Sequence, residues 1–267
     1  MKNTNKDLFD KIRIDTIKTV SYNIEYNIRE SVRMKSIFIF GDSVSKGIMW
    51  DQARSKYQLL RDSFVNLFSQ RRDVTIKNYA RLGCTVEKGK SIMEKHLDQL
   101  KQADFVVFEF GGNDCDYDWP AIAENPDLEH KPKTPIDTFI DCYTNMVVTV
   151  KEAGRHLFLL NLPPIDAQKY FAYISRGVNG DNILKWLGGR ADYIYRWHEM
   201  YSLEVNKLAM ALSVPLIDIR SHFLKRKDYS DLICADGIHP NQEGHRLITN
   251  AIDTAVDRFI ATNAITL

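Results

Sequence analysis

Four short segments of the chain carry residues suited to acyl transfer. They are Gly41-Asp42-Ser43, Gly83, Gly111-Gly112-Asn113-Asp114 and Asp236-Gly237-Ile238-His239. A serine hydroxyl is a weak nucleophile at neutral pH until an adjacent base takes its proton, and histidine is the usual base. Ser43 and His239 can fill these two roles, and Asp236 can orient the imidazole from three residues away. Together the four segments supply a nucleophile, a base, an orienting acid and oxyanion donors.

The oxyanion donors come from the two middle segments. Gly83 has no side chain, so its backbone N–H can approach a substrate closely, and Asn113 can donate from its side-chain amide. Each residue alone has an ordinary structural explanation, as a helix N-cap for Ser43, a turn for Gly83 and an Asx-turn for Asn113. Asp42 and Asp114 are expected to hold loops. Because all four segments occur together, we favour the catalytic interpretation.

Apolar, β-prone runs precede these segments. The runs span residues 36–40, 74–76, 105–110, 156–160 and 214–219. They are continuous rather than alternating, which is typical of strands buried on both faces. Helical patterns lie between them, and an alternation of strands and helices indicates right-handed crossovers and a parallel sheet. We therefore predict an α/β protein of three layers, α/β/α, with an open five-stranded parallel sheet.

The helical patterns place apolar residues at helical spacing over residues 57–68, 86–100, 136–147, 205–212 and 248–259. In open parallel sheets, ligands bind beyond the carboxyl ends of the strands. Ser43, Gly83 and Asn113 all fall just past predicted strand ends, and Asp236 and His239 fall in the loop before the last helix. We therefore expect one edge of the sheet to gather all five residues.

These motifs resemble those of the GDSL, or SGNH, hydrolase family. The resemblance rests on residues 41–47, the Gly83 block, residues 111–114 and residues 236–240, and it spans residues 36–260. It implies a flavodoxin-like fold and hydrolysis of carboxylic esters, often with loose substrate preference. It also implies the backbone N–H of Ser43 as a third oxyanion donor. Some members of the family act on lipids, some deacetylate sugars and a few transfer acyl groups.

Two stretches depart from the simple alternation. Residues 1–33 contain a period-two pattern that also fits a helix, and we expect an accessory segment that is a candidate contact for a homo-oligomer. Residues 34–267 are expected to form the hydrolase domain. Within that domain, residues 165–201 form an aromatic-rich insertion before the helix at 205–212. A connection this long is often a lid or a binding loop.

Aromatic residues near the predicted site are candidates for substrate binding. Tyr117 and Trp119 follow the Gly-Gly-Asn-Asp segment, and Tyr170 and Trp197 lie in the insertion. Aromatic rings offer large apolar faces with a polar handle, so these four can wall an acyl or sugar pocket. Packing beneath a long loop explains them equally well. His198 can also reach the site, although a packing or surface role is favoured for it.

Composition and charge argue against several classes of protein. The 267 residues are 44% hydrophobic and 27% charged with a net charge of +1, so no electrostatic footprint for nucleic acid is visible. No apolar run approaches the roughly 20 residues of a membrane span. The polar N-terminus lacks the apolar core of a secretion signal, and we expect a cytoplasmic protein without a membrane partner. The four cysteines show no metal-type spacing, and the expected mechanism needs no metal or cofactor.

The sequence therefore predicts a serine esterase that acts on a small-molecule ester with a small acyl group. O-acetyl groups on carbohydrates are a candidate substrate. An acyltransferase that passes the acyl group to a sugar hydroxyl would use the same residues. A non-catalytic binding module of the same fold is the third hypothesis, and it would be expected to lack a triad or donor residue. None of these residues is missing from the chain.

Overall fold

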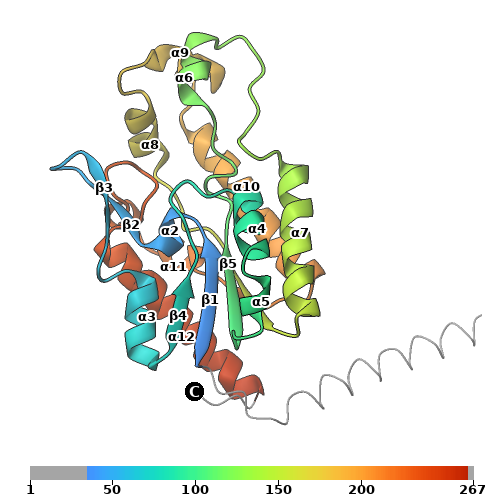
Figure 1. Cartoon of the computed structure of the whole chain (residues 1–267). Helices are drawn as coiled ribbons and strands as arrows, with labels where there is room; N and C mark the ends of the chain where they lie inside the picture. Colours follow the sequence, from blue (N-terminus) through green and yellow to red (C-terminus); the bar gives the residue numbers. More distant parts are fainter. Residues whose placement is uncertain (1–34, 264–267) are drawn as a thin grey trace, which may run out of the picture.

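The computed structural model describes residues 35–263 (Figure 1). Its strands are β1 Ser36–Gly41, β2 Ile48–Asp51, β3 Lys56–Leu59, β4 Thr75–Asn78, β5 Phe105–Glu109, β6 His156–Leu160 and β7 Leu216–Ile217. Its helices are α2 Ser43–Lys46, α3 Phe64–Arg72, α4 Val86–Glu94, α5 Leu97–Leu100, α6 Trp119–Glu124, α7 Ile136–Glu152, α8 Ala167–Ile174, α9 Gly180–Trp186, α10 Asp192–Ala211, α11 Arg220–Leu224, the 3-10 helix η1 Tyr229–Leu232, and α12 Gln242–Asn263.

The central sheet has five parallel strands in the order β4-β1-β5-β6-β7. Counted among these five strands alone, the order is 2-1-3-4-5, the flavodoxin-like arrangement. The prediction of a five-stranded parallel sheet is confirmed. From β1 the chain first adds β4 on one side and then returns to add β5 on the other side, so the strand order reverses between β1 and β5. Ligands bind at such a switch point. Ser43 follows β1 and Asn113 follows β5, so both lie at that point.

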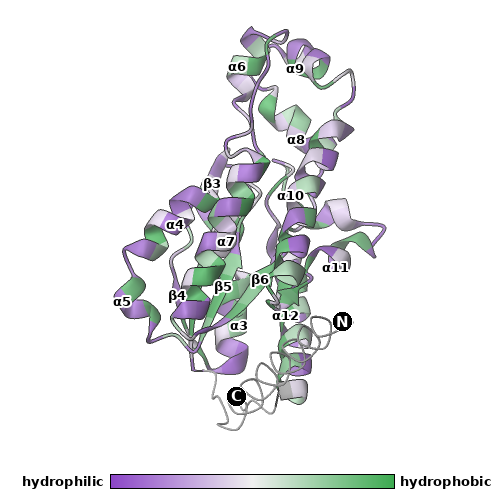
Figure 2. Ribbon diagram, turned by 90° about the vertical axis from the view of Figure 1, so that its right-hand side faces the viewer, coloured by the Kyte–Doolittle hydropathy of each residue, from purple (hydrophilic) through white to green (hydrophobic). Residues whose placement is uncertain are grey.

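Helices cover both faces of the sheet, which explains the continuous apolar runs. Within β1, Phe38 and Phe40 join a core beneath α4, α7 and α10, whereas Ile37 and Ile39 join a second core beneath α3 and α12. Successive side chains of a strand point to opposite faces, so both sets must be apolar when both faces are covered. Figure 2 shows hydrophobic central strands such as β5 and β6 among helices that carry both hydrophobic and hydrophilic residues.

A third apolar cluster lies beyond the carboxyl ends of the strands, and we call it the aromatic cap. It consists of α6, α8, α9 and the first half of α10, which lie together at the top of Figure 1. Its buried members are Tyr117, Trp119, Ile122, Ala123, Ile165, Tyr170, Ile183, Leu187 and Ile194. The insertion at 165–201 is therefore mostly helical, and it packs together with α6, which the sequence analysis did not assign to it.

Three predicted elements have different bounds in the structure. The helical pattern at 57–68 is helical only from Phe64, because Ser63 caps α3 and residues 56–59 pair with β2 as an antiparallel hairpin. The pattern at 86–100 is divided into α4 and α5. The strand predicted at 214–219 has only two residues, and Pro215 before it has no N–H to donate to a sheet ladder.

Several sequence predictions concern parts of the chain or properties that the structure leaves open. The patterned N-terminal segment and its role as a subunit contact lie outside the described residues, so they stay predictions.

Within residues 35–263, no helix is both long and apolar enough to cross a membrane. The same range contains no cluster of three or more His, Cys, Asp or Glu side chains arranged for a metal ion. All four cysteines are buried and free.

Candidate active site

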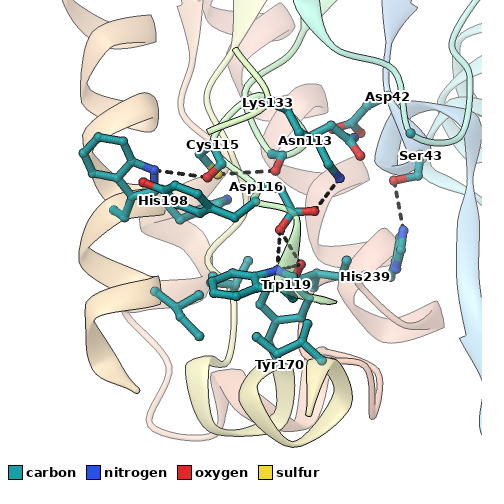
Figure 3. Close-up of a pocket in the computed structure, with 18 of the residues that line it drawn as sticks. Asp42, Ser43, Asn113, Cys115, Asp116, Trp119, Lys133, Tyr170, His198 and His239 are labelled. Carbon is teal, nitrogen blue, oxygen red and sulfur yellow. Dashed lines mark hydrogen bonds and ion pairs between the residues drawn. The ribbon is translucent and has the colours of Figure 1, made fainter. Parts of the chain in front are cut away.

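A cavity of about 710 Å³ opens beyond the carboxyl ends of the strands. Ser43, Gly83, Asn113 and His239 all line it, so the tertiary fold brings together the four segments that are far apart in the sequence. The aromatic cap forms much of the opposite wall. Figure 3 shows the polar residues of this cavity and the hydrogen bonds between them.

Two hydrogen bonds connect Ser43, His239 and Asp236 in that order. The Nε2 atom of His239 lies 2.9 Å from Ser43 Oγ, and its Nδ1 atom lies 2.5 Å from Asp236 Oδ2. Asp236 is fully buried and His239 is 2% exposed, so little water competes for these bonds. In this geometry the imidazole can take the hydroxyl proton of Ser43, while the carboxylate fixes the tautomer and stabilises the imidazolium.

The tight turn from Asp236 to His239 depends on Gly237. This residue has φ +80°, in the left-handed region that glycine adopts without strain. A Cβ atom at Gly237 would lie 2.2 Å from the backbone nitrogen of Tyr170 in α8. Asp236 Oδ1 also accepts the backbone N–H of His239 at 3.3 Å. The three-residue spacing thus lets one carboxylate hold both the backbone and the ring of His239.

Ser43 begins the short helix α2 directly after β1. Asp42, not Ser43, is the N-cap of this helix, and Asp42 Oδ1 accepts the N–H of Val44 at 2.8 Å. The structural explanation of Ser43 as a helix cap therefore does not apply. The prediction that Asp42 holds a loop agrees with these contacts. The Ser43 hydroxyl is left to face His239 at the edge of the cavity.

Gly83 and Asn113, the predicted oxyanion donors, line the same cavity as Ser43. Gly83 has φ +68°, which favours glycine, and no atom lies within 4 Å of the position a Cβ would take. Asn113 Nδ2 donates to Asp42 Oδ2 at 3.0 Å. An amide nitrogen carries two protons, so this bond fixes the orientation of Asn113 and leaves a second proton for a ligand.

Three buried carboxyl groups lie behind the nucleophile. Asp42 is 2% exposed, Glu109 is 1% exposed and Asp114 is fully buried. Burial raises the pKa of Asp114 to about 7, although its Oδ1 accepts the N–H of Val86 at the start of α4. Burial also raises the pKa of Asp42, and it raises that of Glu109 still further above its usual range. The sequence analysis missed Glu109, although it is the only charged residue in the apolar run 105–110.

The four predicted substrate-binding aromatics all line the cavity. Trp119 Nε1 and the Tyr170 hydroxyl both donate to Asp116 Oδ1, at 2.8 and 2.6 Å, while Trp197 Nε1 donates to the carbonyl oxygen of Cys115. Their polar atoms are thus occupied within the protein. Tyr117 packs among Trp119, Trp186 and Trp197. These residues are packed within the cap and also line the cavity, so a role in substrate binding stays a prediction.

Asp116 joins the cap to the loop after β5 and was not singled out from the sequence. Besides Trp119 and Tyr170, it pairs through Oδ2 with Lys133 Nζ at 2.6 Å (Figure 3). Its position just after the Gly-Gly-Asn-Asp segment is the sequence feature that could have identified it. Because its oxygens are occupied by three donors from separate segments, Asp116 fixes the wall of the cavity relative to Asn113.

Tyr57 and His198 also line the cavity beyond the predicted set. The Tyr57 ring lies edge-on to His239 with centroids 5.1 Å apart, and its hydroxyl lies 3.0 Å from the hydroxyl of Tyr173. His198 is 4% exposed, and its Nδ1 has no hydrogen-bond partner among residues 35–263. Burial, aided by the nearby charge of Arg220, lowers the pKa of His198 well below its usual value. A neutral imidazole thus lies at the cavity.

Comparison with known proteins agrees with this architecture. Residues 39–247 match the GDSL-like lipase/acylhydrolase family. A GDSL esterase/lipase of rice, Oryza sativa subsp. japonica, is 20% identical over 197 residues, which are 71% of this chain and 67% of that protein.

Solved structures share the fold at low sequence identity. A lipase/acylhydrolase from Enterococcus faecalis is 20% identical, with a TM-score of 0.58 over 84% of this chain and 96% of the other. A catalytic mutant of an acetylxylan esterase from Geobacillus stearothermophilus is 17% identical, with a TM-score of 0.60 over 84% and 94% of the two chains. With its motif segments gathered at one cavity, the chain belongs to the GDSL-like lipase/acylhydrolase family and is a serine hydrolase of carboxylic esters.

Proposed function

We propose that the chain hydrolyses esters of small acyl groups through an acyl-enzyme formed on Ser43. His239 acts as the base and Asp236 as the orienting acid. The observation that carries the proposal is the hydrogen-bonded row from Ser43 Oγ through His239 to Asp236, at the wall of a cavity of about 710 Å³. A nucleophile, base and orienter within hydrogen-bond reach are the geometric requirement for such chemistry.

In the first half of the reaction, Ser43 Oγ attacks the carbonyl carbon of the ester while its proton passes to His239 Nε2. The carbonyl oxygen becomes an oxyanion, and the donors proposed for it are the backbone N–H groups of Ser43 and Gly83 and the side-chain amide of Asn113. The imidazolium then gives its proton to the leaving alcohol oxygen, the carbon–oxygen bond breaks, and the acyl group remains on Ser43.

In the second half, water repeats the attack on the acyl-enzyme. His239 takes a proton from the water, the second tetrahedral intermediate uses the same donors, and Ser43 regains a proton as the carboxylic acid leaves. If a sugar hydroxyl replaces the water, the same steps transfer the acyl group instead. The hydrolase and the transferase therefore differ only in the acceptor that enters the cavity.

We further propose that the substrate is an O-acetylated carbohydrate. The cavity volume is in the range of sites for drug-sized molecules and far exceeds the needs of an acetyl group, so the alcohol part must occupy most of it. Aromatic rings from the cap are suited to packing against the apolar faces of a sugar. An acetylxylan esterase among the similar structures makes acetylated sugars a reasonable first class to test.

The first experiment measures acid release from p-nitrophenyl esters of increasing chain length by the wild type and Ser43→Ala. Turnover by the wild type alone, highest for acetate, supports the proposal. A serine-directed phosphonate should add once, and peptide mapping should locate it at Ser43. Labelling at a different serine overturns the assignment of the nucleophile.

The substrate class is tested with acetylated mono- and oligosaccharides. Hydrolysis with a kcat/KM well above that of p-nitrophenyl acetate is expected, because a sugar can pack against the aromatic rings of the cap. A kcat/KM equal to or below that of p-nitrophenyl acetate contradicts the proposed substrate class. Acetylated product on an added acceptor sugar, instead of free acetate, identifies a transferase.

A further inference from the structure

Glu109 is a buried acid with no role in the chemistry described so far. It is the last residue of β5, pairs in register with Gly41 of β1 and is 1% exposed. A buried and uncompensated carboxylate costs several kcal/mol of stability. Its contacts must therefore account for its presence directly behind the nucleophile.

On one side, Glu109 binds the helix that begins with Ser43. Its Oε2 atom accepts the hydroxyl of Ser45 at 2.8 Å and the backbone N–H of Ser45 at 3.3 Å. The first N–H groups of a helix have no partner within the helix. Asp42 accepts that of Val44 and Glu109 accepts that of Ser45, whereas neither carboxyl takes the N–H of Ser43. The two acids thus hold the turn while leaving the proposed oxyanion donor unblocked.

On its other side, Glu109 is hydrogen-bonded to Asp42, whose Oδ2 accepts the side-chain amide of Asn113. No donor from residues 35–263 reaches Glu109 Oε1. As a carboxylate, Glu109 would leave that buried atom unsatisfied, whereas as an acid it donates to Asp42. Burial and the neighbouring charge of Asp42 raise the pKa of Glu109 well above its usual range. A proton on Glu109 thus allows the two buried acids to pair.

The backbone around this pair is closely packed. A Cβ atom at Gly41 would lie 2.8 Å from Ser45 Oγ and 2.9 Å from the carbonyl oxygen of Glu109. A Cβ atom at Gly112 would lie 3.2 Å from Asp42 Oδ2. The space around both acids is thus limited by backbone, and their side chains have little freedom to move independently of Ser45 and Asn113.

We propose that Glu109 is a positioning residue, which holds the nucleophile turn through Ser45 and the oxyanion amide through Asp42 and Asn113. The proposal rests on the esterase function proposed above. Loss of the Glu109 proton removes the bond to Asp42 and places two negative charges side by side in a buried space. Asn113 and the turn at Ser43 then lose their common support. A fall in activity at alkaline pH is the expected consequence.

Other groups near the pair titrate differently. They are Asp114, Cys84 and Tyr143. Burial raises the pKa of Cys84 to about 12 and that of Tyr143 well above its usual range, so both stay neutral over the range tested. Asp114 is a second buried acid and therefore provides the matched control.

The test is the dependence of kcat/KM on pH for p-nitrophenyl acetate, from about pH 6 to about pH 10, corrected for spontaneous hydrolysis. Glu109→Gln retains a donor for Asp42 and an acceptor for Ser45 but cannot ionise. We expect the wild type and Asp114→Asn to lose activity on the alkaline side, and Glu109→Gln to retain activity within about tenfold at neutral pH without that loss. Glu109→Ala should lose about 10²-fold while remaining folded by circular dichroism.

The proposal is overturned by an alkaline loss in Glu109→Gln equal to that of the wild type, by its disappearance in Asp114→Asn alone, or by a wild type with no alkaline loss. The rate of phosphonate addition to Ser43 gives the same pH profile without turnover. Absence of both turnover and labelling in the wild type overturns the esterase function as well. Normal Ser43-dependent turnover with unchanged alkaline loss in Glu109→Gln overturns the positioning role alone.

Discussion

The two walls of the cavity are built on different physical principles. The wall that carries Ser43, Asn113 and His239 consists of short loops at strand ends, held by hydrogen bonds to buried carboxyl groups. The opposite wall is the aromatic cap, in which rings pack edge-on and only a few polar atoms are paired, mainly at Asp116. Hydrogen bonds fix atoms to within a few tenths of an ångström, whereas aromatic packing mainly conserves volume and shape.

This difference separates the tasks of the two walls. Chemistry on an ester carbonyl needs donors and a base at defined points, and buried polar networks provide such definition when all their members are satisfied. Recognition of the rest of the substrate needs a surface of suitable shape. Changes on the first wall should therefore reduce turnover of every ester, whereas changes in the cap should alter the preference among esters.

The largest effect is expected for Ser43→Ala. Loss of a serine nucleophile should reduce kcat by about 10⁵- to 10⁶-fold for short and long esters alike, with little change in thermal unfolding. Initial rates with p-nitrophenyl esters and a melting curve for each protein provide the check. Wild-type activity in this variant would remove the basis for placing the chemistry on this wall.

A smaller but still large effect is expected for Asp236→Asn. The amide cannot hold the imidazole tautomer or stabilise the imidazolium, and kcat should fall by about 10⁴-fold. His239→Ala should lose more, because it removes the group that transfers the proton. The two variants and the wild type are compared with one substrate at saturation. A greater loss in Asp236→Asn than in His239→Ala contradicts the assigned roles.

For Asn113→Ala, we expect kcat to fall by about 10²- to 10³-fold through loss of one oxyanion donor. KM should change little, because the donor acts on the transition state more than on the ground state. Asn113→Asp tests the sign of the charge, since a carboxylate at this point would repel the oxyanion as well. Equal kcat for wild type and Asn113→Ala would show that Asn113 only holds Asp42.

The buried acids should also give stability a dependence on pH. The pKa of Asp114 is about 7 in the folded protein, whereas an exposed aspartate titrates near 3.8. Between these values the folded state binds more protons than the unfolded state, so the free energy of unfolding should fall as pH rises from about 4 to about 7. Urea unfolding across this range should show a smaller fall in Asp114→Asn, and an identical fall would contradict the shift.

The smallest effect is expected for Tyr170→Phe in the cap. This change removes one of the hydrogen bonds to Asp116 and should cost about 1 kcal/mol of stability. The kcat for p-nitrophenyl acetate should stay within a few-fold of the wild type, while KM for larger esters should rise. A loss of kcat shared by all esters would contradict the assignment of different tasks to the two walls.

The sequence predicted the polar wall better than the cap. The motif residues can be recognised in the sequence because acyl transfer needs particular side-chain and backbone atoms. Their positions after predicted strands indicate that they lie at one edge of the sheet. Glu109 escaped notice because its role depends on Ser45 and Asp42, which are distant or inconspicuous in the sequence. The β2–β3 hairpin was missed because Tyr57, Leu60 and Phe64 happen to recur at helical spacing.

The sequence alone determined the five strands of the central sheet, the burial of both faces of that sheet and the candidate reactive side chains. These properties follow from local hydrophobic periodicity and from residue chemistry, both of which can be read without distances. Only the tertiary structure decided that α6 joins the insertion to form a cap, that Asp116 links it to the Asn113 loop, and that Glu109 lies behind Ser43. Each depends on contacts between residues far apart in the chain, whose register local patterns do not specify.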